Sequence, residues 1–331
     1  MNLYLTIGDC NGVGVEVLIK ALKSGVHRSF RHTAQLHIVA NARTFIEAAA
    51  ALKYRVNEEH GNLIIEGTAY PLLACTTYAP ITYGQETDEA GELAREALER
   101  AVGAWYEGSA DGIVTMPISK KNIQRSGFIY PGQTEFFAAR AGTEHTPLMI
   151  LCHESVRVAL VTIHESLRNV SALLTRDRVE KTIGMMETAL REDFSCAKVR
   201  IAVLGCNPHA GEAGTIGREE VDIITPAIES MRERGVAVEG PFPADGFFAH
   251  GAYKEYDGIV AMYHDQGLIP LKLLAQGAGV NLTAGLPLVR TSPDHGTAFA
   301  IAGKNIADAR STMQAIALAA QIVEHRHHSR S

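Results

Sequence analysis

Short apolar runs that alternate with helical patterns are the feature that most limits how this sequence can fold. Residues 3–7 form an apolar run of strand length, and residues 13–22 repeat apolar side chains at helical spacing. Residues 35–40 and 41–52 repeat this order, and Asn41 is placed to cap the second helix. Strands that alternate with helices are typical of a parallel sheet covered by helices. The sequence therefore predicts an α/β fold with a largely parallel sheet.

The same alternation extends over the rest of the chain, with one exception. Residues 148–152 and 157–163 are apolar runs separated by His153-Glu154-Ser155, a spacing that predicts an antiparallel hairpin. The other strand patterns fall at 112–115, 201–205, 258–262 and 280–283, and the other helical patterns at 88–106, 176–193, 218–235 and 307–324.

Composition excludes several classes of protein. The 331 residues are 46% apolar and 21% charged, which is typical of one large or two medium globular domains. A net charge of −6 offers no basic surface for nucleic acid or an anionic membrane, and no apolar run approaches the ~18 residues of a membrane span. The N-terminus resembles a first strand and not a signal peptide. Five scattered cysteines match no disulfide framework or zinc knuckle, so we expect a cytoplasmic protein.

Three of the apolar runs lead into a histidine, namely His164, His209 and His264. In a parallel sheet, ligands bind beyond the carboxyl ends of the strands. Three imidazoles that meet there suit Zn²⁺ or a similar divalent ion. The alternative is that each histidine is hydrogen-bonded at the start of its own loop. The spacings match no metal motif, so the residues alone leave both interpretations open.

Two loops have the composition of anion sites. The glycines of residues 8–14 follow the first strand and precede a helix, where backbone amides can bind an anion. The pattern is GxxxGxG and not the GxGxxG dinucleotide fingerprint, and a tight turn explains the glycines equally well. Ser119 and Lys120 either bind a phosphate or cap the next helix.

Other polar residues stand beside apolar stretches. Lys272, Asn281 and Arg290 suit a phosphorylated or carboxylated substrate, or are isolated surface residues. The loop Asp294-His295-Gly296-Thr297, with residues 301–305 after it, either faces an adenine and ribose or is a plain loop before a helix.

Several short blocks of the chain match one known protein family, in the same order along the sequence. Between Gly8 and about Ile316, this sequence resembles the 4-hydroxythreonine-4-phosphate dehydrogenase family of vitamin B6 biosynthesis. The loop from Asp294 to Lys304 is also similar to the adenine-binding loop of isocitrate and isopropylmalate dehydrogenases, which share the fold. The blocks that carry the resemblance are residues 115–120, 132–136, 207–212, 240–245, 261–267 and 285–297.

The resemblance implies an isocitrate/isopropylmalate dehydrogenase-like architecture. It consists of two α/β/α domains with mostly parallel sheets and an active-site cleft between them. Residues 1–125 and 285–331 are expected to form the first domain, and residues 126–284 the second domain, which carries the dimer interface. The family is homodimeric, and one metal ligand of each site comes from the other subunit.

The resemblance also implies roles for particular residues. His164, His209 and His264 match the metal ligands, for Zn²⁺, Mg²⁺ or Co²⁺. NAD or NADP is expected as cofactor. The substrate-binding positions are Gln133, Thr134, Lys272, Asn281 and Arg290; the candidates for the catalytic base or its relay are Asp245, Asp265 and Lys272; and the cofactor-binding positions are Asp294, His295, Gly296, Thr297 and Asn305.

The activity implied is the oxidation of 4-phosphooxy-L-threonine at C3, followed by decarboxylation to 3-amino-2-oxopropyl phosphate, in pyridoxal 5′-phosphate biosynthesis. Gln133 replaces a usual histidine, Cys10 and Val15 replace usual prolines, and Gly246 replaces a usual threonine. These departures keep an alternative open: a related dehydrogenase of 4-phosphothreonate, 4-phosphoerythronate or an aromatic dihydrodiol. A phosphate-handling transferase or hydrolase would use the glycine loop and Lys120, and would need no nicotinamide.

Overall fold

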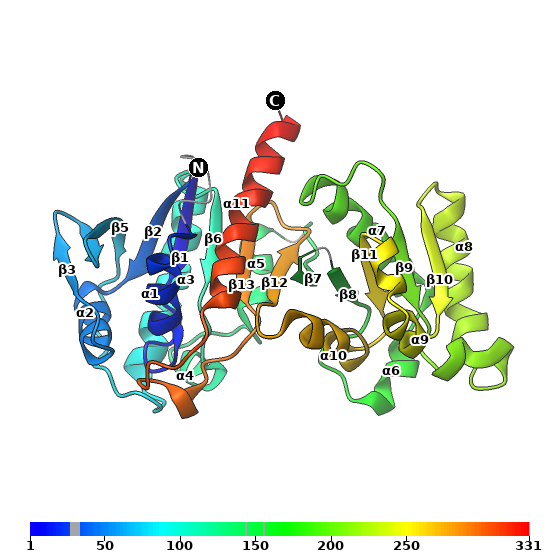
Figure 1. Cartoon of the computed structure of the whole chain (residues 1–331), viewed down its shortest axis with the longest axis horizontal. Coiled ribbons are helices and arrows are strands. Elements are labelled where there is room, and N and C mark those ends of the chain that lie inside the picture. The colour runs from blue at the N-terminus through cyan, green and yellow to red at the C-terminus, as the bar shows by residue number, and fades with distance from the viewer. Residues whose placement is uncertain (27–33, 143, 155, 331) are drawn as a thin grey trace. The chain divides into compact units, whose positions relative to one another are not determined.

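A computed structural model describes residues 1–26, 34–142, 144–154 and 156–330. The chain divides into two compact units. The first comprises Met1–Pro147 and Leu286–Glu324, and the second comprises Leu148–Gly285 and the residues from His325 onward. Figure 1 shows both units coloured along the chain.

The first unit is a mixed sheet with helices on it. Its strand order is β13-β6-β1-β2-β5-β4-β3, in which β13, β6, β1, β2 and β5 run parallel and β4 and β3 continue as antiparallel strands. Its elements are β1 (Asn2–Thr6), α1 (Gly14–Lys23), β2 (Gln35–Ala40), α2 (Ala42–Ala51), β3 (Val56–Glu59), β4 (Asn62–Ile65), β5 (Thr68–Ala74), α3 (Asp88–Tyr106), β6 (Gly112–Thr115), α4 (Lys120–Arg125), α5 (Gln133–Ala141), β13 (Val289–Pro293), η5 (Phe299–Ile301) and most of α11 (Arg310–Arg330).

The second unit is built around a six-strand arrangement, β10-β9-β11-β8-β7-β12. Strands β10, β9, β11 and β8 are parallel, whereas β7 is antiparallel to both of its neighbours. Its elements are β7 (Leu148–His153), β8 (Val156–Leu160), α6 (Leu167–Leu173), α7 (Arg176–Glu192), β9 (Ile201–Leu204), η2 (Pro208–Gly214), η3 (Glu220–Ile224), α8 (Thr225–Glu233), β10 (Val238–Phe242), α9 (Ala244–Ala249), η4 (Ala252–Glu255), β11 (Gly258–Ala261), α10 (His264–Ala275) and β12 (Val280–Ala284).

The predicted α/β class is confirmed, and so are local details. Strands β7 and β8 pair as the expected antiparallel hairpin, with Ile150 opposite Ala159; the turn residue Ser155 lies outside the described residues. The Asn41 side chain accepts a hydrogen bond from the Thr44 amide at 3.1 Å and caps α2. The expected helix at 218–235 is confirmed over residues 219–233, with its first part, η3, in the π-helical form and Pro226 in the first turn of α8.

The division between the units differs from the expected boundary at residue 125. Residues 126–147 belong to the first unit. Helix α5 is fixed there because Phe136 and Phe137 are completely buried, and because the Gln133 Nε2 donates a hydrogen bond to the Met116 carbonyl at 3.2 Å. The first boundary therefore falls at Pro147, immediately before β7.

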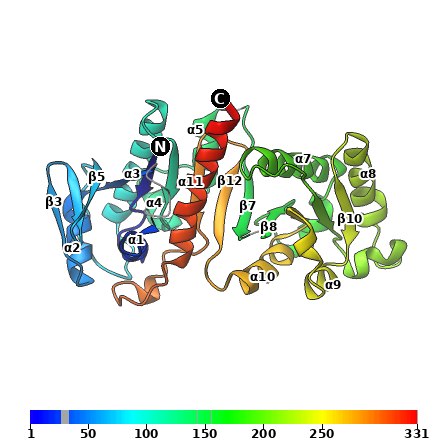
Figure 2. The same cartoon turned by 45° about the horizontal axis from the view of Figure 1, so that its top comes forward.

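Two further expectations can be compared with the structure. All five cysteines are free thiols. Across the described ranges, we find no helix that combines the length and the apolar character needed to cross a membrane. Figure 2 shows the same strands and helices after a turn of 45°.

We predict that two glycines of α3 respond oppositely to alanine. A Cβ at Gly91 would clash with the backbone carbonyl of Asn122 in α4, whereas a Cβ at Gly103 would meet open space. Gly91→Ala should lower the free energy of unfolding by about 1–3 kcal/mol, since the helices would have to separate. Gly103→Ala should raise it by about 0.5–1 kcal/mol through helix propensity. Urea unfolding measures both, and equal effects would contradict the packing described for α3 and α4.

Candidate functional site

The three candidate metal-binding histidines follow three adjacent parallel strands of the second unit. His209 follows β9, His264 follows β11 and His164 follows β8, and the strand order is β9-β11-β8. The register pairs Val260 of β11 with Val203 on one side and with Ala159 on the other. Since the strands are parallel, their carboxyl ends point to the same edge of the sheet. The topology therefore directs all three histidine-bearing loops to one edge.

Hydrogen bonds continue beyond the ends of β8 and β11 and bring two of these histidines together. The Val161 amide donates to the Ala261 carbonyl at 2.9 Å. Thr162 donates to the Met262 carbonyl from its amide at 3.1 Å and from its hydroxyl at 2.7 Å. His164 and His264 each come two residues later, and their ring centroids lie 5.9 Å apart. Two imidazoles at this separation can contribute to one metal site.

His264 is oriented by the residue that follows it. It is the first residue of α10, and its Nδ1 lies 2.7 Å from Oδ1 of Asp265. A carboxylate on one ring nitrogen fixes the tautomer of a histidine and leaves Nε2 as the ligand atom, an arrangement common around metals. In the structure, Asp265 therefore contacts and orients His264, whereas it was expected to be the catalytic base or part of a proton relay.

His209 lies on a different kind of element. It is exposed on η2, in a turn where its own φ is +53°. Within the part of the chain that the structure describes, no group of three or more His, Cys, Asp or Glu side chains could by itself hold a metal ion. One chain therefore pairs His164 with His264, and the third imidazole is not grouped with them.

A residue that the sequence analysis did not identify connects the ends of β11 and β9. Gln266 is buried, its Oε1 accepts from the Met262 amide at 2.7 Å, and its Nε2 donates to the Gly205 carbonyl. This side chain fixes the start of the His264 loop against the start of the His209 loop. Its only signal in the sequence is its position two residues after His264.

The other two candidates for proton transfer also lie on helices of the second unit. Asp245 is an exposed residue in the first turn of α9. Lys272 is an exposed residue in the last turn of α10. Asn281, expected to bind substrate, lies on β12, and among the described residues no group hydrogen-bonds to its buried Oδ1. A buried carbonyl oxygen without a donor suits a ligand that supplies one.

In the first unit, Arg290 and Gln133 form a buried polar cluster. Arg290 on β13 is 3% exposed, and its Nε and Nη2 donate to the Thr115 hydroxyl at 3.1 and 2.7 Å. Nη2 also donates to Gln133 Oε1 at 3.0 Å. Burial lowers the pKa of Arg290 to about 10, so the guanidinium remains charged at neutral pH. Gln133 is thus an acceptor for this cation, which a protonated histidine could not be. Thr134 follows in the first turn of α5.

The glycine loop after β1 uses its amides within the protein. Asp9 donates to the Pro117 carbonyl at 2.9 Å, Asn11 to Asp9 Oδ1 at 3.0 Å, Gly12 to the Asp9 carbonyl at 3.1 Å, and Val13 to the Thr297 carbonyl at 2.9 Å. These four amides are therefore not available to bind an anion, and the glycines of this loop serve a tight turn. Likewise, the Ser119 hydroxyl accepts from the Asn122 amide at 3.3 Å, so Ser119 caps α4.

The expected cofactor loop is packed directly on the glycine loop. A Cβ at Gly12 would lie 2.7 Å from the Thr297 carbonyl oxygen, so this close approach requires glycine. Asp294 donates its amide to the Ser311 hydroxyl at 2.9 Å. His295 Nδ1 lies 3.0 Å from the Gly296 carbonyl, and among the described residues its buried Nε2 meets no hydrogen-bond partner. Residues 294–297 therefore form a fixed loop in which one ring nitrogen remains available to a ligand.

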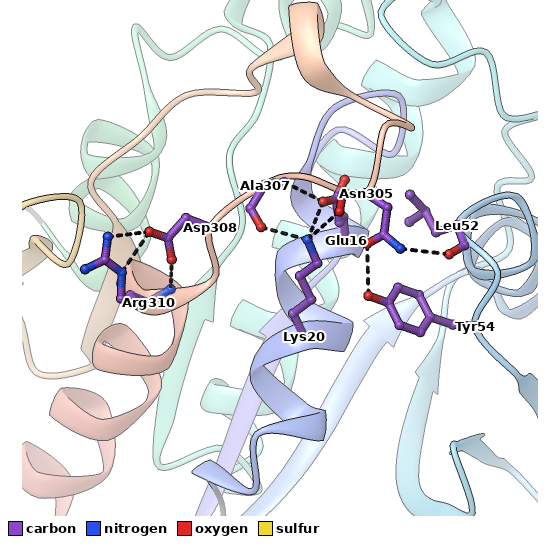
Figure 3. A network of polar contacts seen from close by, with 8 residues as sticks. All are labelled: Glu16, Lys20, Leu52, Tyr54, Asn305, Ala307, Asp308 and Arg310. Atoms are coloured by element: carbon purple, nitrogen blue, oxygen red, sulfur yellow. Dashed lines mark hydrogen bonds and ion pairs between the residues drawn. The ribbon is translucent and has the colours of Figure 1, made fainter.

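Asn305, also expected to bind cofactor, is committed to other contacts. Its Nδ2 donates to the Leu52 carbonyl at 3.2 Å, and its Oδ1 accepts from the Tyr54 hydroxyl at 3.0 Å. Its backbone carbonyl accepts from Lys20, which is paired with the buried Glu16 at 2.7 Å. Figure 3 shows this network holding residues 305–307 against α1. The side chain of Asn305 thus has a structural function.

Nearly the whole chain is similar to known proteins. Residues 24–319 match the family model described as pyridoxal phosphate biosynthetic protein PdxA. The 4-hydroxythreonine-4-phosphate dehydrogenase of Bacteroides thetaiotaomicron is 40% identical over 98% of this chain and 90% of its own length. That of Caulobacter vibrioides is 40% identical over 98% of both.

Solved structures give the same result. The 4-hydroxythreonine-4-phosphate dehydrogenase of Klebsiella pneumoniae is 38% identical and superimposes with a TM-score of 0.81 over 97% of both chains. A terephthalate 1,2-cis-dihydrodioldehydrogenase of Burkholderia xenovorans LB400 is 28% identical, with a TM-score of 0.63 over 97% of this chain and 98% of its own. An isocitrate dehydrogenase of Methylococcus capsulatus, 13% identical with a TM-score of 0.50 over 99% of this chain and 87% of its own, shares the fold.

We predict that Asn305→Gly weakens the fold and leaves the cofactor KM unchanged. Glycine adopts the φ of +57° found at Asn305, so the change does not strain the backbone; it removes the side chain with its two hydrogen bonds and gives the unfolded chain more freedom. The free energy of unfolding should fall by about 1–3 kcal/mol. Tyr54→Phe, which removes one of the same bonds, serves as the control and should have a smaller effect. A raised KM for the nicotinamide cofactor without any loss of stability would show that Asn305 contacts that cofactor instead.

Proposed function

We propose that this chain, which belongs to the PdxA family of pyridoxal phosphate biosynthetic proteins and is a dehydrogenase, oxidises 4-phosphooxy-L-threonine at C3. The oxidised β-keto acid then loses CO₂ to give 3-amino-2-oxopropyl phosphate. The observation that most supports this reaction is the placement of His164, His209 and His264 after three adjacent parallel strands. A strand edge that carries three imidazoles suits metal-assisted oxidation of an alcohol.

The residues present fit a divalent metal ion. His164 and His264 face one another at a ring separation of 5.9 Å, and Asp265 occupies Nδ1 of His264. Imidazole ligands favour Zn²⁺ or Co²⁺, whereas Mg²⁺ prefers oxygen. When bound, such an ion supplies Lewis acidity, which lowers the pKa of the substrate's C3 hydroxyl.

We propose that the third ligand is His209 of the partner subunit in a homodimer. Among the described residues of one chain, His164 and His264 lie together and no third such ligand joins them, so a second copy is the natural source of the missing imidazole. Helix α10, which begins at His264, exposes two large apolar residues one turn apart, Ile269 at 58% and Leu273 at 71%. Exposed apolar residues in such a pair are typical of a subunit interface.

The remaining site residues bind substrate and move its proton. The buried, charged Arg290, and Thr134, which follows the Arg290 partner Gln133 in sequence, suit the phosphate or carboxylate of the substrate. Asn281 supplies an acceptor for the amino group or a hydroxyl. Because Asp265 is engaged with His264, we assign removal of the C3 hydroxyl proton to Asp245 or Lys272.

We assign the nucleotide of NAD or NADP to residues 294–297. This loop is fixed by Val13 and Ser311, and the buried Nε2 of His295 can hydrogen-bond to an adenine or ribose. When bound there, the nicotinamide would supply the hydride acceptor that oxidation at C3 requires. We place the reaction in the cytoplasm, since the five thiols are free and scattered along the chain.

One observation favours a second candidate substrate class. Unlike a protonated histidine, Gln133 carries no charge. Its side-chain amide is also fixed in place, because it bonds to Arg290 and to the Met116 carbonyl. A substrate such as 4-phosphothreonate, 4-phosphoerythronate or an aromatic dihydrodiol makes different demands at this position. A phosphate-handling transferase is not supported, because the amides that would cradle its phosphate bond within the protein.

We predict that a substrate panel separates these candidates. The metal-loaded protein is given NAD or NADP with each of 4-phosphooxy-L-threonine, 4-phosphothreonate, 4-phosphoerythronate and an aromatic dihydrodiol. Formation of reduced nicotinamide, followed by absorbance, should have its highest kcat/KM with 4-phosphooxy-L-threonine. A preference for another member of the panel would replace the substrate proposed above, and turnover of none would remove the proposal.

We predict that His209→Ala loses bound metal and turnover together. Asp265→Asn keeps the size of the side chain but weakens the bond to His264 Nδ1, so metal affinity should fall about 10–100-fold. Asp222→Asn, on the surface and paired with Arg218, is the control and should behave as the wild type. Metal content is measured by atomic emission and turnover by reduced nicotinamide. Full activity in metal-free His209→Ala would refute the metal site.

A further inference from the structure

The turn that carries His209 has a backbone conformation that L-amino acids rarely adopt. Residues 209–213 all have positive φ, with values of +53°, +50°, +77°, +44° and +53°. Only the middle one, Gly211, is a glycine. Side chains disfavour this left-handed conformation, so consecutive residues keep it only when their surroundings impose it. The position of the His209 ring therefore depends on whatever holds this turn.

The buried side chain of Glu220 holds the residues that lead into this turn. It is 3% exposed, and its Oε1 accepts hydrogen bonds from the amides of Cys206 and Asn207, both at 2.7 Å. Its Oε2 accepts from the Asn207 side chain at 2.9 Å. The three donors belong to the two residues that directly precede Pro208 and His209. One buried carboxylate thus fixes the entry to the left-handed turn.

The surroundings of this carboxylate leave it little freedom. A Cβ at Gly205 would lie 3.1 Å from Oε1, and a Cβ at Gly211 would clash with Oε2. Glu220 also begins the π-helical turn η3, a conformation that is frequent at functional sites. The neighbouring Glu219 adds a bond to the Asn207 side chain at 2.7 Å. The carboxylate therefore packs closely against both Gly205, which precedes the turn, and Gly211, which lies within it.

We propose that Glu220 is the positioning residue for His209. It does not touch the metal; it holds the turn so that the imidazole is presented in a ligand geometry. Charge-assisted hydrogen bonds are stronger than neutral ones, and an anion accepts from several amides at once. Residues that orient a metal ligand in this way control the affinity of the site. This inference rests on the role of His209 as a metal ligand, proposed above.

The test uses Co²⁺ alone, added to the metal-free full-length protein. Its affinity is measured by calorimetry, its geometry by the visible absorption of the bound ion, and the fold by thermal unfolding. Glu220→Ala removes all three hydrogen bonds. Glu220→Gln keeps an acceptor for the two amides but presents a donor to the Asn207 side chain, and it serves where the alanine variant does not fold. Asp222→Asn loses the same charge two residues further on and is the matched control.

We expect Glu220→Ala to weaken Co²⁺ binding by about 10–100-fold and to change the visible spectrum, with Glu220→Gln intermediate. A purely structural role would lower the unfolding midpoint while both the affinity and the spectrum stayed as in the wild type, and that result would overturn the inference. His209→Ala is measured alongside. If it binds Co²⁺ as the wild type does, the proposed metal site itself fails; if it loses binding while the Glu220 variants keep it, only the inference about Glu220 fails.

Discussion

The parallel pairing of β9, β11 and β8 is the constraint on which the candidate metal site depends. Their register is set by backbone hydrogen bonds between buried apolar residues such as Val203, Val260 and Ala159. The pairing of β8 and β11 continues beyond the strand ends, where Thr162 donates hydrogen bonds to the Met262 carbonyl. His164 and His264 are therefore brought together by the sheet, and not by loops that could move independently of it.

Buried hydrogen bonds position the candidate site residues of both units, from side chains to backbone in the second unit and between side chains in the first. In the second unit, Gln266 and Glu220 bond to backbone groups at the starts of the loops that carry histidines. In the first unit, the buried Arg290 is held by Thr115 and Gln133. Leaving any of these buried backbone or side-chain groups unpaired would cost free energy, so the supporting residues constrain the loops and side chains that they contact.

Local patterns in the sequence were sufficient for the fold and for part of the site. Alternation of apolar runs and helical periods predicts the parallel sheets, and polar His153 and Glu154 between two such runs predict the β7–β8 hairpin. Strands that end in histidine leave a shared site and three separate histidines as alternatives, and the structure brings His164 and His264 together. These features depend on residues close together in sequence, together with a general property of parallel sheets.

Features that depend on tertiary contact could not be predicted in the same way. The glycine loop has the composition of an anion site, and only the structure shows that its amides bond internally, two of them to the distant carbonyls of Pro117 and Thr297. Asn305 lies in a block similar to a cofactor loop, yet Leu52 and Tyr54, far away in sequence, occupy its side chain. Burial of Phe136 and Phe137 moves the boundary between the units to Pro147 for the same reason.

Complementation between inactive chains tests most directly the claim that the metal site is shared by two subunits. Differently tagged His164→Ala and His209→Ala chains are co-expressed, and the dimers that carry both tags are purified. One of their two sites then holds all three histidines, so these dimers should show about half of the wild-type activity. Dimers of His164→Ala with His264→Ala should remain inactive, because both ligands are assigned to the same chain. No recovery in the first pair, or recovery in the second, would contradict the account.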